Sequence, residues 1–436
     1  MRLAFLTPLP PAVSGIADYS ADVLALLAPH HEIDVFHDQP VVDRGRLPSA
    51  CLVHRADKFL NRHAAAPYDL AIYQMGNAPD HAFLYPLLRR VPGLLVLHDL
   101  VLHHSRARIF LESPEALAYA GDPSSVVLRD AARRVLAGYE AEAAYSYPAQ
   151  ASRLAETHFS TVGPLLPYAY PLCRLPVEAS RLTAVHNAYM AAAVRDEAPG
   201  TETIRIAMPV VATRVAPEAV AALRQRYGLR SDDLVVGCFG LMTREKGIET
   251  VARSLARATA ALPRLRLLLV GQVPDRAFLA RRLEALGVRA RAIVTGRVPW
   301  DELHTHIEAA DIVVHLRYPT ARETSAALLR VLAQGRPTII SDLEHLSEIP
   351  NDAVLRADVA DEEGAVTRGI LRLGDRPETR ARLGTAAAAF VAREHSAERC
   401  LADYEAAITL ARAQPDSAPR RWPAHWLGHA DDRMPT

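Results

Sequence analysis

The sequence predicts an α/β protein of two doubly wound domains, each with a parallel sheet covered by helices. The chain has 436 residues, more than the roughly 250–300 at which single hydrophobic cores stop growing. In each half, short apolar runs of strand length alternate with amphipathic helical stretches, which is the pattern of βαβ units. The segment 311–342 reads strand, loop, helix and strand, as one crossover of a parallel sheet does.

The first half opens with an apolar strand at Leu3–Leu6, a loop over 8–14 and a helix over Ala17–Leu27 with its apolar residues on one side. From Ser105 to Pro176 the sequence becomes alanine-rich and aromatic without a clear strand, so we predict a helical insertion over about 105–176, of unknown role. This half has a Rossmann-like beginning. Further expected elements are strands at Ile33–Phe36, Leu70–Tyr73, Leu94–Leu97, Leu182–Val185 and Ile204–Ile206, and a helix over His81–Arg90.

The second half restarts with a helix near Pro217 and carries an amphipathic helix over Ile248–Leu262. We therefore predict an N-terminal domain over 1–210, a C-terminal domain over 211–412 and a tail over 413–436 that is rich in proline and charge. Strands of the second domain are expected at Leu234–Phe239, Leu267–Val270, Ala292–Val294, Ile312–Val314 and Thr338–Ile340.

Composition narrows the class of protein. Lys+Arg 50 balance Asp+Glu 50, so no electrostatic argument supports a nucleic-acid partner, and contact with a membrane is unsupported. The 4 cysteines lie far apart, which argues against a zinc site or a disulfide framework and suits a reducing compartment. No apolar run reaches the roughly 18 residues of a membrane span, and the N-terminal run is too short for a signal peptide. A cytoplasmic protein is expected.

Two loops of the second half follow strands at the sheet edge where open α/β sheets bind ligands. Lys246, one of two lysines in the chain, precedes Gly247 and a helix whose N-terminal amides attract anions. If the ligand is a nucleotide-diphosphate sugar, Lys246 can offset the charge on the diphosphate as it leaves the sugar. The alternative is that Lys246 is a solvated residue at a helix start. Glu323 is predicted to open the next helix, where it either meets a ligand or merely favours the helix dipole. The pattern indicates a site for a sugar nucleotide.

Several motifs, in this order along the chain, resemble those of the retaining glycosyltransferases of family 4. The resemblance covers nearly the whole chain apart from the tail. It implies a GT-B fold, with two Rossmann-like domains facing across a cleft. The motifs are Ser14–Tyr19, Tyr73–Asn77, His98–Asp99, Gly240–Gly247, Arg322–Ser325 and Leu332–Pro337.

The resemblance implies roles for four residues. Lys246 would stabilise the leaving diphosphate, and Glu323 and His98 would contact the donor sugar. Gly15, at a loop-to-helix junction, would lie against the donor phosphates or the acceptor; its alternative is a plain turn glycine. Asp99 is expected to orient His98 or to cap a helix.

The donor-binding set departs from the family pattern at two positions. Leu241 stands where a second cation is usual, and Arg244 can substitute for it. Arg330 stands where a second glutamate usually holds the ribose, although an arginine can only donate hydrogen bonds. His186 and Asn187 follow another strand end and either line the cleft or serve packing and capping. The remaining residues that the resemblance places at the donor are Gly240, Gly247, Thr324 and Ser325.

The resulting hypothesis is a metal-independent enzyme that moves a hexosyl group from a nucleotide-diphosphate sugar to a hydroxyl of a carbohydrate or glycolipid acceptor, with retention, in glycan or glycoconjugate biosynthesis. No cofactor is implied. His103 and His104 near His98 make a metal site conceivable, but their spacing and the metal independence of the fold argue against it. The alternatives are a catalytically degenerate binding or scaffold protein and a nucleotide-sugar epimerase on the same fold.

Overall fold

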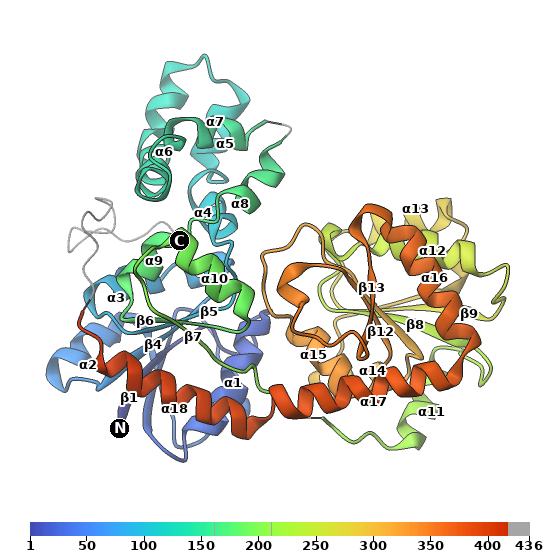
Figure 1. Ribbon diagram of the computed structural model, residues 1–436. Helices are drawn as coiled ribbons and strands as arrows, with labels where there is room; N and C mark the ends of the chain where they lie inside the picture. The colour runs from blue at the N-terminus through green and yellow to red at the C-terminus, as the bar shows by residue number, and fades with distance from the viewer. Residues whose placement is uncertain (161, 211, 417–436) are drawn as a thin grey trace. The chain divides into compact units, whose positions relative to one another are not determined.

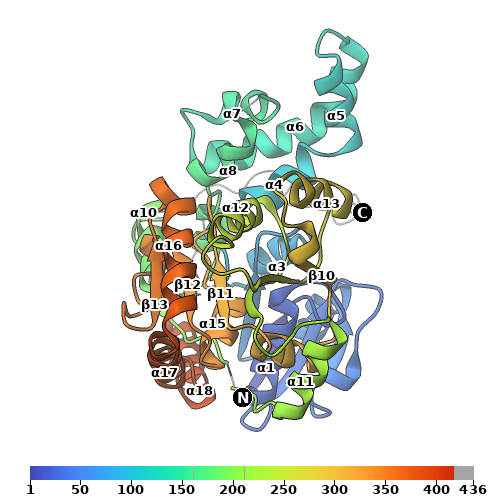
Figure 2. The same ribbon diagram turned by 90° about the vertical axis from the view of Figure 1, so that its right-hand side faces the viewer.

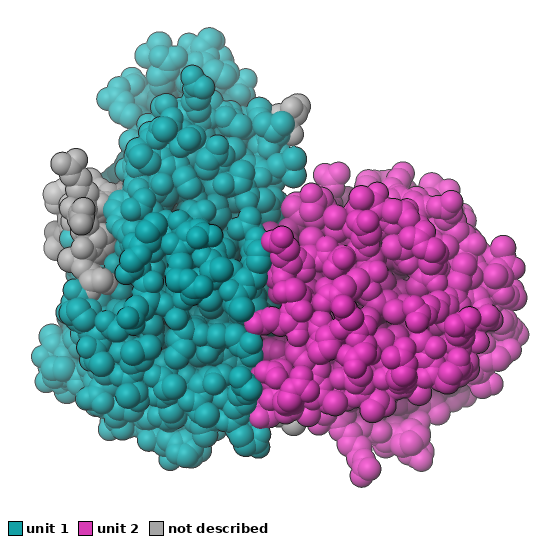
Figure 3. Space-filling model, viewed as in Figure 1, with its two compact units in different colours: residues 1–207, 321–324, 398–436 teal, residues 208–320, 325–397 magenta. Residues whose placement is uncertain are grey.

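The computed structural model describes residues 1–160, 162–210 and 212–416. The chain divides into two compact units, coloured separately in Figure 3. The first contains residues 1–207, 321–324 and 398–436, and the second contains 208–320 and 325–397. Each unit has a parallel sheet with helices on both of its faces (Figure 1), so the predicted α/β class is confirmed.

The first unit is built on a seven-stranded sheet of order β3-β2-β1-β4-β5-β6-β7 in the described residues. All six strands predicted in this half of the chain are confirmed. The edge strand β3 was not predicted, because Leu52-Val53-His54-Arg55 is partly exposed and has no apolar run. The strands are β1 (Arg2–Leu6), β2 (Glu32–His37), β3 (Leu52–Arg55), β4 (Leu70–Met75), β5 (Leu94–Leu97), β6 (Leu182–Val185) and β7 (Thr203–Arg205).

Helices fill the chain between β5 and β6, and they rise from one end of the unit (Figure 2). The ion pair between buried Arg106 of α4 and Glu142 of α6 ties this segment together, with the guanidinium 4.2 Å from the ring centroid of Tyr85. That the segment is an insertion stays a prediction. The helices of this half of the chain are α1 (Gly15–Leu27), α2 (Phe59–Ala65), α3 (Leu84–Arg90), α4 (His103–Phe110), α5 (Pro114–Gly121), α6 (Val126–Ser146), α7 (Ala151–His158), α8 (Leu166–Ala169), α9 (Arg174–Ala179) and α10 (Ala188–Glu197).

The second unit is built on a six-stranded sheet of order β10-β9-β8-β11-β12-β13 in the described residues. All five strands predicted here are confirmed. The edge strand β13 was not predicted. The strands are β8 (Leu234–Phe239), β9 (Leu265–Val270), β10 (Ala292–Gly296), β11 (Ile312–His315), β12 (Thr338–Ser341) and β13 (Val354–Ala357), and the helices are α11 (Pro217–Arg226), α12 (Ile248–Ala258), α13 (Arg276–Ala285), α14 (Trp300–Glu308), α15 (Ala326–Ala333), α16 (Glu362–Asp375) and α17 (Pro377–Glu394).

The last helix, α18 (Ala397–Ala413), groups with the first unit from Glu398 onward, although the predicted C-terminal domain extends to residue 412. Its polar side chains explain the difference. Tyr404 Oη lies 2.7 Å from Tyr19 Oη of α1, and Glu405 Oε1 lies 2.7 Å from His31 Nε2. Of the expected tail over 413–436, residues 417–436 lie outside the described part of the chain.

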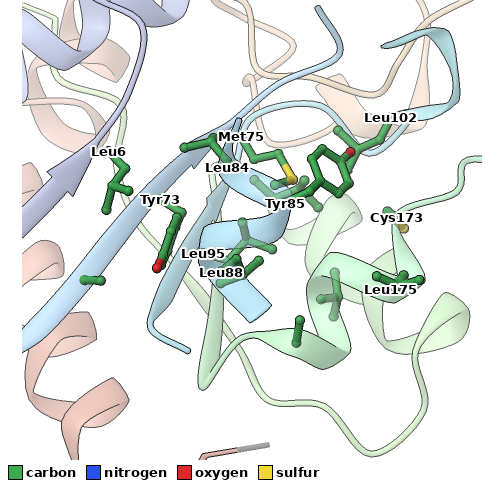
Figure 4. Close-up of a cluster of buried hydrophobic side chains, with 14 of the residues drawn as sticks. Leu6, Tyr73, Met75, Leu84, Tyr85, Leu88, Leu95, Leu102, Cys173 and Leu175 are labelled. Atoms are coloured by element: carbon green, nitrogen blue, oxygen red, sulfur yellow. The ribbon is translucent and has the colours of Figure 1, made fainter. Parts of the chain in front are cut away.

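The core of the first unit holds closely packed side chains from β1, β4, β5 and the helices beside them (Figure 4). Each buried large aliphatic side chain contributes about 1.5–3 kcal/mol to folding. All 4 cysteines are free and buried. Within the described residues, no helix combines the length and the apolarity that crossing a membrane requires. The residues of this core that are labelled in Figure 4 are Leu6, Tyr73, Met75, Leu84, Tyr85, Leu88, Leu95, Leu102, Cys173 and Leu175.

Buried histidines should make the first unit acid-sensitive. Burial lowers the pKa of His81 and of His103 to about 4. Between pH 6.5 and 4 the unfolded chain binds protons that the folded one does not, so stability is lost as the pH falls, by up to about 3 kcal/mol per histidine. We expect the urea midpoint to fall from pH 7 to pH 5, and His103→Gln to flatten that dependence. If the urea midpoint of His103→Gln fell with pH as steeply as that of the wild type, His103 would not be a source of the acid sensitivity.

Candidate active site

The loop after β8 places Lys246 over the backbone of Gly240. Gly240 (φ 107°) and Gly247 (φ 59°) both adopt left-handed conformations that favour glycine, and Gly247 leads directly into α12. The Lys246 side chain is buried, with 7% of the residue exposed. A Cβ added at Gly240 would lie 3.7 Å from Lys246 Nζ. A solvated helix-start residue would be exposed, so the burial of Lys246 favours the functional interpretation.

The charges of Lys246 and Arg317 both act on His315 at the carboxyl end of the second sheet. His315 ends β11, and its pKa is held well below the usual value by burial and then by the charges of Lys246, Arg317 and His345. The amides at the start of α12 add a positive field at the same edge. This cluster of positive charge has the electrostatic character of an anion-binding site. Arg244 begins the preceding turn and is exposed, as is Leu241.

Glu323 does not open a helix, which corrects the prediction. Helix α15 begins at Ala326, and Ser325 is its N-cap, with Ser325 Oγ accepting from the N–H of Leu328 at 3.3 Å. Serine is a strongly preferred N-cap, so the helix begins directly after Ser325, and Glu323 lies two residues before this cap. The alternative of a glutamate that only favours the helix dipole is therefore lost, since that effect falls off within the first turn.

Residues 321–324, which carry Glu323, belong to the first unit. The N–H of Leu100 donates to Ala321 O at 3.1 Å. Asn187 Nδ2 donates to Arg322 O at 3.3 Å and to Thr324 Oγ1 at 3.0 Å. These bonds hold the residues on both sides of Glu323. We name residues 321–324 the Glu323 loop.

The Asn187 side chain is used at both ends. Asn187 Oδ1 accepts from the N–H of Met190 at 2.7 Å and caps α10, while its Nδ2 reaches the Glu323 loop. Of the two interpretations left open for Asn187, capping is therefore confirmed, and holding the loop is a further contact that sequence reasoning missed. Nothing in the local sequence signals this contact, because its partners lie 135 and 137 residues away.

His98 follows β5 and is buried, with both ring nitrogens engaged inside the first unit. Its Nε2 lies 2.8 Å from Gln74 Oε1, and its Nδ1 lies 3.1 Å from His186 Nε2. Burial, and then the nearby His186 and His81, hold the pKa of His98 well below its usual value. A hydrogen bond from this ring to a sugar would require one of these contacts to open. Asp99 Oδ2 accepts from the N–H of Asn77 at 3.1 Å.

The remaining candidates lie at helix ends. Gly15 is the first residue of α1, after the N-cap Ser14, and a Cβ there would meet no atom within 4 Å. Arg330 is buried in α15 with its guanidinium 4.5 Å from the Trp300 ring centroid, an arrangement that stabilises a cation. Burial and then the Arg330 charge lower the pKa of His304. Among residues 1–160, 162–210 and 212–416, no group of three or more His, Cys, Asp or Glu side chains is arranged to hold a metal ion.

Some of the predicted residues lie close together within each unit. In the second unit, Gly240, Lys246 and Gly247 lie together in the loop after β8. Residues 220–390, which contain this loop, match the family model "Glycosyl transferases group 1". This part of the chain is therefore similar to the group 1 glycosyl transferases. In the first unit, His98 lies among Gln74, His186 and Tyr19, and Asn187 holds the Glu323 loop.

Curated relatives match parts of this chain. It is 33% identical over 121 residues to a GDP-mannose-dependent alpha-(1-6)-phosphatidylinositol monomannoside mannosyltransferase of Mycolicibacterium smegmatis, covering 28% of this chain and 30% of that protein. It is 28% identical over 178 residues to an alpha-D-kanosaminyltransferase of Streptomyces kanamyceticus, covering 40% of this chain and 45% of that protein. The chain therefore matches less than half the length of these relatives.

Solved structures match nearly the whole chain. A sucrose-phosphate synthase from Thermosynechococcus elongatus superposes with a TM-score of 0.64 at 18% identity, covering 93% of this chain and 98% of that one. HepE of Anabaena, solved in complex with UDP, gives a TM-score of 0.61 at 14% identity, covering 94% and 100%. At these identities the likeness concerns the fold alone, and the predicted GT-B fold is confirmed.

Proposed function

We propose that this protein is a retaining glycosyltransferase that moves a hexosyl group from a nucleotide-diphosphate sugar to a hydroxyl of a carbohydrate or glycolipid acceptor. One observation carries the proposal. In the part of the chain that matches the group 1 glycosyl transferases, a buried lysine lies just before α12, where its charge and that of Arg317 act on His315, with no bulky side chain at Gly240 to cover it. The names of the two relatives, which are glycosyltransferases, and the UDP complex of HepE agree with it.

Lys246 and the α12 amides supply the main catalytic effect. As the bond from the anomeric carbon to the diphosphate oxygen breaks, negative charge grows on that oxygen, and a fixed ammonium offsets it without reorganising. Glu323 accepts hydrogen bonds from donor-sugar hydroxyls and sets the sugar's orientation. The acceptor hydroxyl attacks the face that the diphosphate leaves, and its proton passes to the departing phosphate oxygen. No covalent carboxylate nucleophile and no metal ion is needed.

The test is a panel of UDP-, GDP-, ADP- and dTDP-sugars, scored by calorimetry and by nucleotide release with and without glycan acceptors. Release that depends on an acceptor, with an anomeric configuration unchanged by NMR, supports the proposal. An inverted product would refute retention. Binding without turnover indicates the degenerate scaffold, which the replacement of the ribose-binding glutamate by Arg330 favours. Interconversion of the sugar nucleotide without acceptor indicates the epimerase.

Asn187→Asp should weaken transfer without unfolding the protein. The aspartate keeps an oxygen to cap α10 but faces Arg322 O and Thr324 Oγ1 with a second oxygen, so it cannot donate to the carbonyl. We expect kcat/KM to fall about tenfold, since one or two hydrogen bonds of about 1 kcal/mol each are lost. The melting temperature checks the fold, and Thr324→Val, which removes one of the two contacts, should give a smaller loss. Unchanged kcat/KM in the aspartate variant would show that the loop needs no such bond.

A further inference from the structure

A chain of buried polar groups runs from α18 to His98 within the first unit. Its members come from α1, α18, β4 and the ends of β5 and β6. None of them is exposed by more than 5%. The successive contacts are Tyr19 Oη to Tyr404 Oη (2.7 Å), Tyr404 Oη to Gln74 Nε2 (3.2 Å), Gln74 Oε1 to His98 Nε2 (2.8 Å), His98 Nδ1 to His186 Nε2 (3.1 Å) and His186 Nδ1 to Ile206 O (3.1 Å).

Counting protons from one end decides the state of His98. The carbonyl of Ile206 can only accept, so His186 Nδ1 carries a proton and neutral His186 presents a lone pair at Nε2. The facing atom, His98 Nδ1, must then donate. Neutral His98 therefore has its lone pair at Nε2, and that nitrogen needs a donor. Its neighbour is the Gln74 amide.

The Gln74 amide has two orientations that place oxygen and nitrogen in the same two positions. With the oxygen toward His98, His98 Nε2 must also carry a proton, and the ring becomes a buried imidazolium. With the NH₂ group toward His98, every contact is satisfied by neutral groups: Tyr19 donates to Tyr404, and Tyr404 donates to Gln74. An imidazolium beside His186 and His81 would be costly at a site exposed by 5%.

We propose that Tyr404 of α18 and Gln74 of β4 are positioning residues that hold His98 as the neutral Nδ1–H tautomer. This tautomer joins His98 to His186, and so connects the ends of β5 and β6. Two residues beyond His98, Leu100 donates to the Glu323 loop, and directly after His186, Asn187 does the same. The chain of contacts therefore fixes both anchors of that loop. Helix α18 acts on the transfer reaction through them.

The state of His98 is read from the ¹⁵N spectrum of the full-length protein labelled with ¹⁵N-histidine, with its signals assigned by their loss in His98→Gln. We expect a protonated Nδ1 and an unprotonated Nε2 at pH 7.5. A protonated Nε2, whether alone or in an imidazolium, would overturn the proposal. This measurement needs no substrate, so it stands whether or not the protein proves to be a glycosyltransferase.

Two variants each remove one hydroxyl from the same Tyr19–Tyr404 contact. Tyr404→Phe leaves the Gln74 oxygen without its donor, so the amide can turn its oxygen toward His98, and a protonated Nε2 of His98 should appear. Tyr19→Phe leaves Tyr404 free to donate and should keep the wild-type tautomer. If Tyr404→Phe keeps the wild-type tautomer, or if both variants change it alike, Tyr404 has no such role. Should Tyr404→Phe not fold, Gln74→Glu offers acceptors at both ends and should protonate His98 Nε2.

The expected effect of these residues on turnover rests on the proposed function. With a donor and acceptor pair that the wild type turns over, Tyr404→Phe should lower kcat about three- to tenfold. Its affinity for the free nucleotide should stay unchanged, since the proposed diphosphate site is in the second unit. If Tyr404→Phe changes the tautomer of His98 but keeps the wild-type kcat, the tautomer does not affect the reaction, and the positioning role of Tyr404 is overturned. If the wild type turns over no sugar nucleotide, the proposed function fails, and the spectra still decide the tautomer.

Discussion

Replacing Lys246 by alanine is expected to lower kcat/KM for acceptor-dependent nucleotide release by about 10²–10³-fold, the usual cost of losing one preorganised group that stabilises transition-state charge. The loss should fall mainly on kcat, because the charge on the leaving diphosphate grows during bond breaking. Nucleotide affinity should weaken as well, since the same ammonium faces the anion in the ground state. Both quantities are measured by coupled nucleotide release and by calorimetry.

The chain provides a matched control for Lys246→Ala. Lys58 is the other lysine, and its side chain is 64% exposed beside Asp57. Lys58→Ala should leave kcat/KM unchanged. Lys246→Ala should raise the pKa of His315, because the substitution removes a nearby positive charge. Wild-type turnover in Lys246→Ala would exclude this lysine from catalysis, whereas a collapse in the melting temperature would mark it as a structural residue.

Glu323→Gln is expected to lower kcat/KM about 10- to 100-fold, because hydrogen bonds from sugar hydroxyls to a carboxylate are worth about 1.5–3 kcal/mol and a neutral amide retains only part of that. The substitution preserves the size of the side chain. The Glu323 loop should stay in place, because it is held through the backbone of Ala321 and Arg322 and the hydroxyl of Thr324. The loss is measured as acceptor-dependent nucleotide release.

The position of Glu323 outside α15 sharpens this test. A glutamate in the first turn would stabilise the helix by about 0.3–1 kcal/mol, and its neutralisation would lower the stability of the second unit. We expect no such change in urea denaturation. Glu344→Gln, at an exposed residue after β12, is the control and should keep wild-type activity. Full activity in Glu323→Gln would remove the carboxylate from the donor site.

Most of the strand and helix pattern was predictable, because buried strands and amphipathic helices have local signatures. The two strands that were missed, β3 and β13, lie at sheet edges. Edge strands carry polar and charged residues such as His54, Arg55 and Arg356, which weaken the apolar pattern. The predicted start of α15 at Glu323 is wrong because an acidic residue and a capping serine both favour a helix start, and the structure uses Ser325.

The sequence by itself determined the two-unit α/β architecture, the family of residues 220–390 and the position of Lys246 before a glycine and a helix, since these depend on residues close together in the chain. Tertiary structure decided which groups hold His98 and the Glu323 loop. Tyr404 meets Gln74 across 330 residues, and Asn187 meets Thr324 across 137. Such contacts leave no periodic signal, because they arise when separately folded segments pack and their buried polar groups must each find a partner.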